Sequence, residues 1–137
     1  MTKERLRRYG AIKREHRQLE EQLEQIETQL YSPKAQRLTG MPSAPHDGNA
    51  MEELAAKHIE LQEHYRRLIA ELSEEMLAVE AAIEGLDPTS RTLMRYRYID
   101  GLKWEEICVA MNYSWPNVHK MHKRILDRLR DEEQDNI

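Results

Sequence analysis

The sequence of 137 residues is poor in the residues that support several classes of protein. Phenylalanine is absent and Cys108 is the single cysteine, so neither a disulfide framework nor a cysteine-based zinc site is expected. Five glycines and five prolines are few for a chain this rich in Glu, Leu, Arg and Lys, and this composition favours helix. No run approaches the roughly 20 apolar residues that cross a bilayer, and no secretory signal follows Met1. We therefore expect a soluble, cytoplasmic, all-α protein with no membrane partner.

The first segment, residues 2–31, carries a narrow apolar stripe. Its apolar residues recur in alternating steps of three and four, which is the heptad pattern of a coiled coil, and His16 fills the one gap. A helix of about 30 residues is about 45 Å long. Because so narrow a seam makes no core of its own, this helix is expected to pair with another helix.

A second long helix is predicted from about residue 49 to residue 85. The segment 32–48 before it holds three prolines and two glycines, which is typical of a linker. That linker is either partly disordered or wraps the helix ends. The same heptad spacing continues in the second helix, and Ile59, Ile69 and Leu77 add a second apolar flank. The seam, predicted to form either a hairpin within one chain or an oligomer interface between chains, consists of Ile12, His16, Leu19, Leu23, Ile26, Leu30, Leu54, His58, Leu61, Tyr65, Leu68 and Leu72.

The third segment, residues 87–137, changes to shorter elements. Helices are predicted at 88–99, 103–112 and 115–131, and Asp87-Pro88 is a typical start, with Asp as N-cap and Pro in the first turn. The short connection Tyr113-Ser114 joins the second and third helices, as in a helix-turn-helix. The expected fold is therefore a long two-helix coiled coil or hairpin at 1–86, followed by a three-helix domain at 87–137 with an acidic tail.

Residues 91–114 (RTLMRYRYIDGLKWEEICVAMNYS), followed by Val118, resemble the helix-turn-helix of bacterial sigma factor region 4. The likeness covers about residues 87–130. It is closest to small prophage-encoded proteins that place such a domain after a coiled coil, some of which are late-gene activators of the RinA and ArpU type. Cys108, Asn112 and Lys103 depart from the usual Ala, Gly and Ser or Thr of the family. The resemblance implies that the chain binds double-stranded DNA in the cytoplasm of a bacterial host.

The helix predicted at 115–131 separates into two faces when each residue is stepped by about 100° from Val118. The apolar residues fall near Val118, whereas the basic residues fall between about 140° and 240° away. The third helix of a helix-turn-helix enters the major groove. Asn117 is therefore expected to read adenine and Lys120 guanine or phosphate. The predicted DNA-binding residues are Lys103, Ser114, Asn117, His119, Lys120, Lys123 and Arg124, while Trp115 and His122 are expected to face inward.

Other chemistry has little support in the sequence. There is no Gly-rich phosphate loop, nucleophile elbow or pocket-like carboxylate pair, so we expect neither an enzyme nor a bound cofactor. His119 and His122 have the spacing of a metal pair, but no third ligand is evident. His16 and His58 occupy seam positions, where polar residues fix register and histidines can make assembly pH-sensitive.

The expected function is that of a phage or prophage DNA-binding transcriptional regulator that assembles as a homo-oligomer, first as a dimer. Two alternatives stay open: a small terminase-like DNA-packaging subunit, and an adaptor that docks on RNA polymerase or another host protein. The formal net charge of −4 argues mildly against nucleic acid. However, residues 1–17 carry a net charge of +5 and residues 87–130 carry +4, so the acidity lies in residues 18–86 and in the tail.

Overall fold

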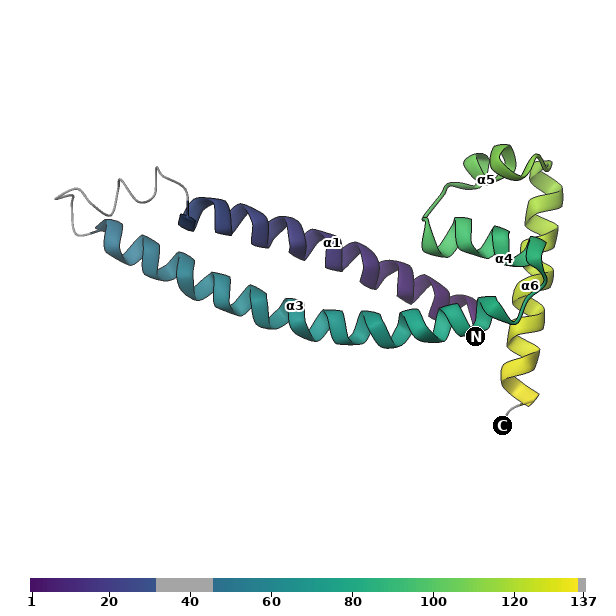
Figure 1. Cartoon of the computed structure of the whole chain (residues 1–137), viewed down its shortest axis with the longest axis horizontal. Helices are drawn as coiled ribbons and strands as arrows, with labels where there is room; N and C mark the ends of the chain where they lie inside the picture. Colours follow the sequence, from purple (N-terminus) through teal and green to yellow (C-terminus); the bar gives the residue numbers. More distant parts are fainter. Residues whose placement is uncertain (32–45, 136–137) are drawn as a thin grey trace. The chain divides into compact units, whose positions relative to one another are not determined.

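The structure is a computed structural model that describes residues 1–31 and 46–135 (Figure 1). Most of the linker predicted at 32–48 lies outside the described residues, namely residues 32–45. The last two residues of the chain lie outside them as well. The elements in chain order are α1 (Lys3–Tyr31), α3 (His46–Glu84), α4 (Pro88–Met94), the π-helical turn η1 (Arg95–Ile99), α5 (Trp104–Met111) and α6 (Trp115–Asp135). The described part contains no strand, and two long helices precede a small helical domain, which confirms the predicted all-α class. No helix in the described ranges is both long and apolar enough to span a bilayer.

Three helix boundaries differ from the prediction. Helix α3 already begins at His46, inside the predicted linker. The helix predicted at 88–99 is regular only to Met94, and its last residues form the wider turn η1, in which the Asp100 N–H donates to the Arg95 carbonyl at 2.9 Å. Helix α6 continues to Asp135, through most of the predicted acidic tail. An ion pair of 3.1 Å between Arg128 and Glu132 supports this extension.

The chain divides into two compact units, each described here by itself. One unit comprises Met1–Ile12 together with the chain from Leu72 onward, and the other comprises Lys13–Glu71. Helices α1 and α3 each run from one unit into the other. This division differs from the expected boundary between residues 86 and 87, because Leu6 and Ile83 belong to the same hydrophobic core as Val118.

The unit Lys13–Glu71 is an antiparallel helical hairpin. The Tyr65 hydroxyl donates to Glu20 at 3.0 Å, and His58 Nε2 lies 3.2 Å from Glu27 Oε1, so positions rise along α1 as they fall along α3 (Figure 1). The His16 ring stacks on Tyr65 with centroids 5.0 Å apart. The seam residues of this unit are buried or half-buried between these two helices of one chain. In this structure the seam therefore serves pairing within the chain.

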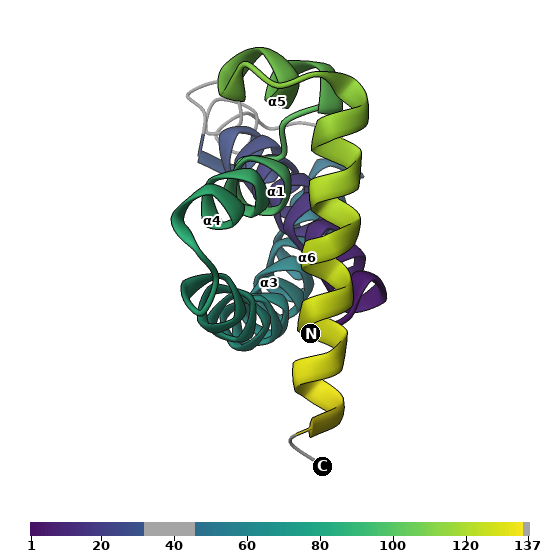
Figure 2. The same cartoon turned by 90° about the vertical axis from the view of Figure 1, so that its right-hand side faces the viewer.

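The other unit is built around α6. Its fully buried side chains come from five elements, and the largest of them are Leu6, Ile83, Leu93, Met94, Ile107, Val79 and Val118. Figure 2 shows α5 crossing the N-terminal end of α6, and Figures 1 and 2 together show α4 crossing the direction of α6 at a steep angle. Asp87 is the N-cap of α4, because its carboxylate accepts from the Ser90 N–H at 3.2 Å and Pro88 occupies the first turn, as predicted. These contacts fix which face of α6 remains outside.

Candidate nucleic-acid interface

The turn between α5 and α6 is set by Asn112. Its backbone is left-handed, with φ 57° and ψ 44°, and its N–H is bonded to the carbonyls of Cys108 and Val109 at the end of α5. Among non-glycine residues, Asn adopts this conformation with the least strain. Ser114 then accepts from the Asn117 N–H at 3.3 Å and caps α6, as predicted. The chain thus turns within the three residues 112–114, which is the geometry of a helix-turn-helix.

The inner faces of the two helices are buried against each other. Ile107 of α5 and Val118 of α6 are completely shielded from solvent, and Ile125 and Leu129 continue the buried side of α6. Cys108 is half-buried beside Ile107. Burial of side chains of this size contributes about 1.5–3 kcal/mol each. This packing determines the orientation of α6 about its own axis.

The opposite face of α6 exposes the polar residues that the sequence singled out. Six of the seven predicted DNA-binding side chains are exposed: Lys103, Ser114, Asn117, Lys120, Lys123 and Arg124. Lys103 precedes α5 and caps it without a side-chain hydrogen bond. Within the described residues, no carboxylate forms an ion pair with Lys120, Lys123 or Arg124. A row of unpaired cations on an exposed helix is suited to a polyanion, although the role of each residue stays a prediction.

His119 is the exception in that set. Its ring lies between two indoles, with centroid distances of 4.6 Å to Trp104 and 4.3 Å to Trp115. Its Nε2 is buried and has no hydrogen-bond partner in the described part of the chain. A base contact through this nitrogen requires the ring to move. Trp115, expected to face inward, is 48% exposed and covers the outer side of His119.

His122 faces inward, as predicted, and is only 6% exposed. Its Nε2 lies 2.7 Å from the Tyr98 hydroxyl oxygen. Burial, followed by the positive charges of Lys3 and Arg97 and the neighbouring His119, lowers the pKa of His122 to about 4. The ring is therefore neutral at pH 7, and a hydrogen bond joins its Nε2 to the Tyr98 hydroxyl. No three His, Cys, Asp or Glu side chains in the described ranges are grouped as a metal site.

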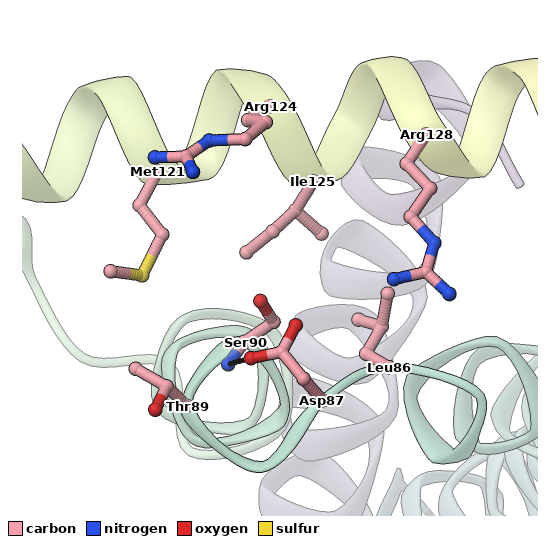
Figure 3. Close-up of a pocket in the computed structure, with 8 residues that line it drawn as sticks. All are labelled: Leu86, Asp87, Thr89, Ser90, Met121, Arg124, Ile125 and Arg128. Atoms are coloured by element: carbon pink, nitrogen blue, oxygen red, sulfur yellow. Dashed lines mark hydrogen bonds between the residues drawn. The ribbon is translucent and has the colours of Figure 1, made fainter.

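A small cavity of about 200 Å³ lies on the side of α6 that faces the α3–α4 corner. Figure 3 shows Met121, Arg124, Ile125 and Arg128 of α6 facing Leu86, Asp87, Thr89 and Ser90 of the α3–α4 corner across it. The cavity leads from the core to the guanidinium groups at the surface. Arg124, a predicted DNA-binding residue, thus lies next to the start of α4.

Sequence reasoning missed the contribution of the first turns of α1 to this unit. Leu6 is 1% exposed and Tyr9 is also buried, both in the core that contains Val118 and Ile125. The predicted seam did not include Leu6, which lies one step of three before Tyr9. That extra step was the available signal.

The geometry agrees with the comparison with known families. No curated protein and no solved structure matches the chain. The family model of sigma-70, region 4 matches residues 76–129, which begins in the last turns of α3, where Val79 and Ile83 enter the core. This part of the chain is therefore a sigma-70 region 4-like domain, a helix-turn-helix of the DNA-binding type.

Proposed function

We propose that this protein is a DNA-binding transcriptional regulator of the type that phages and prophages use to activate late genes. The observation that carries the proposal is the exposed face of α6, where Lys120 and Lys123 lie away from the buried Val118 and Ile125 and the exposed Asn117 flanks them. A helix anchored in this way inserts its N-terminal half into the major groove. We place the protein in the cytoplasm of a bacterial host and assign it a binding role without catalysis.

The chemistry of each side chain on this face determines whether it contacts bases or phosphates. The Asn117 amide matches the donor and acceptor pair of adenine, and Lys120 matches the acceptors of guanine. Lys123, Arg124 and Lys103 lie at the edges of the face and neutralise phosphates, which gives affinity without sequence preference.

A selection from random duplexes followed by titrations tests this proposal. Against the selected duplex, Asn117→Ala is expected to weaken binding by about 1–3 kcal/mol, roughly 5- to 150-fold, and to relax the base preference at one position. Lys123→Ala is expected to weaken binding to selected and scrambled duplexes alike and to lower the salt slope by about 0.9. Lys57→Ala, an exposed position on α3, is the control. No enrichment in the selection, or unchanged binding by both variants, contradicts the proposal.

We also propose that the protein forms a homo-oligomer, with a dimer as the simplest form. Because the heptad seam is occupied within the chain, the interface is assigned to the second apolar flank of α3, where Ile59 is 56% and Ile69 is 37% exposed. A dimer presents two recognition helices to half-sites about 34–36 Å apart. Light scattering is expected to give twice the chain mass, and Ile59→Glu/Ile69→Glu is expected to give the monomer mass. A monomeric wild type contradicts this assignment.

The same exposed flank favours a second candidate, an adaptor that docks on RNA polymerase or another host protein. Recovery of polymerase in a pull-down that Ile59→Glu abolishes, together with no DNA enrichment, supports the adaptor over the regulator. A ring-sized mass in light scattering with DNA binding intact supports instead a terminase-like packaging subunit.

A further inference from the structure

The first turns of α1 lie against the helix that carries the candidate interface. Leu6 and Tyr9 are buried in the core with Val118 and Leu129, and the Met1 nitrogen lies 2.6 Å from Glu133 on α6. Figure 2 shows these turns (purple) beside the middle of α6. The N-terminal part of α1 is thus an element of the DNA-binding unit.

The first turns of α1 contact one particular flank of α6. Measured from Val118 in steps of about 100°, His122 and Glu133 lie at about 40° and 60°, and Lys123 follows at about 140°. The α3–α4 corner instead meets the opposite flank of α6, through Met121 and Arg128. Helix α1 therefore borders the exposed face of α6 on the side of Lys123.

Lys3, Arg7 and Arg8 are the exposed cations of these turns. Lys3 and Arg7 are four residues apart in α1, so they lie one above the other on one face of the helix. The charge of Lys3 contributes to the lowered pKa of His122, and the charge of Arg7 acts to lower the pKa of Tyr98, which burial raises. Both cations are therefore close to the buried pair of Tyr98 and His122.

Three carboxylates near this corner are paired with other groups, while Glu4 lies in the first turn of α1 beside Lys3. Glu75 pairs with Arg5 at 3.1 Å, Glu132 pairs with Arg128, and Glu133 pairs with the Met1 nitrogen. The charges that shift the pKa values of His122 and Tyr98 include no carboxylate. Lys3 and Arg7 have no ion-pair partner within residues 1–31 and 46–135. Cations without an ion-pair partner repel one another, and a polyanionic ligand relieves this repulsion.

We propose that Lys3 and Arg7 bind the phosphate backbone of the duplex next to the bases that α6 reads. The inference rests on the proposed function, since it assumes α6 in the major groove. A helix in that groove has a phosphate strand along each side, and an element on its flank meets one of them. The heptad helix α1 thus contributes to DNA affinity as well as to the hairpin.

The test compares two charge-matched double variants of the full chain. In Lys3→Gln/Arg7→Gln the proposed contacts are lost, and in Lys57→Gln/Arg67→Gln one Lys and one Arg are removed from exposed positions on α3. Affinities for the selected and a scrambled duplex are measured between 50 and 300 mM salt. The first variant is expected to lower the slope of log K against log salt by about 1.8, since each phosphate contact contributes about 0.9. Its base preference is expected to stay that of the wild type.

The outcomes distinguish phosphate binding by α1 from DNA binding by the protein as a whole. A reduced slope in Lys3→Gln/Arg7→Gln alone supports the phosphate-binding role of α1. Equal slopes for wild type and this variant overturn the inference and leave the proposed function standing. An equal reduction in both double variants also overturns it, because the effect is then one of net charge. A wild type that binds no duplex overturns the proposed function and the inference together.

Discussion

The buried His122 makes the stability of the DNA-binding unit depend on pH. In the unfolded chain a histidine has a pKa of about 6.5, whereas burial, with the charges of Lys3 and Arg97 and the neighbouring His119, lowers the folded-state pKa of His122 to about 4. The unfolded state therefore binds more protons than the folded state between these two values. The stabilising contribution is fully present above pH 6.5 and is lost as the pH falls towards 4.

The size of the effect follows from the shift. One pKa unit corresponds to about 1.4 kcal/mol, so the contribution of His122 is about 3 kcal/mol over the whole interval. Between pH 7.5 and pH 5.0 the expected loss is about 2 kcal/mol. This is a large fraction of the 5–15 kcal/mol that typically stabilises a domain.

Urea unfolding at pH 7.5 and pH 5.0 measures this loss. His122→Leu removes the titrating ring and leaves the Tyr98 hydroxyl without its partner at 2.7 Å, so it is expected to destabilise the unit by about 1–3 kcal/mol at pH 7.5. The further loss on acidification is expected to be about 2 kcal/mol smaller than in the wild type. His64→Gln is the control, because the His64 side chain is 46% exposed.

Burial of His122 does not govern the pH dependence if wild type and His122→Leu lose the same free energy of unfolding between pH 7.5 and pH 5.0. The same conclusion follows if NMR shows that the ring of His122 titrates near pH 6.5 in the folded protein. Either result places the ring in contact with solvent and removes the role of burial.

Two further predictions concern the turn and the core. Asn112→Ala is expected to destabilise the unit by about 1 kcal/mol because φ is 57°, and Asn112→Gly is expected to be neutral or stabilising; equal melting temperatures for the two variants contradict a conformational role. Ile107→Ala is expected to lower the free energy of unfolding by about 2–5 kcal/mol, whereas Val109→Ala on the same helix, where the side chain is 82% exposed, is expected to change it by less than about 0.5 kcal/mol. Similar losses in urea unfolding for both variants contradict the assigned faces of α5.

The parts of the fold that sequence predicted correctly depend on local chemistry. The heptad spacing requires a partner helix. Asp87-Pro88 is a local signal for a helix start, and Asn112 tolerates the left-handed turn. The exposed face of α6 also follows from its own periodicity, since Val118 and Ile125 mark the buried side. These features need no knowledge of what lies across the core.

The features that were missed depend on contacts distant in sequence. A helical wheel gives the direction of His119 but cannot show that Trp104 from another helix covers its ring. Nor does the local pattern of residues 95–99 indicate the π-helical turn. Leu6 was not part of the predicted seam, and only the packed core shows that it joins Val118. The choice between pairing within and between chains was open for the same reason.

The net charge of this chain is a poor guide to its ligand, because several of its carboxylates are already paired with cations. Glu75 and Glu80 neutralise Arg5 and Arg95, at 3.1 Å and 2.9 Å, and Glu132 of the acidic tail pairs with Arg128 one turn earlier on α6. A carboxylate that is already paired with a cation adds little to the field beyond a Debye length of about 8–10 Å. Lys3, Arg7 and the cations on the exposed face of α6 have no such partner in the described residues. The acidic residues of this chain thus determine which basic side chains remain available to a polyanion.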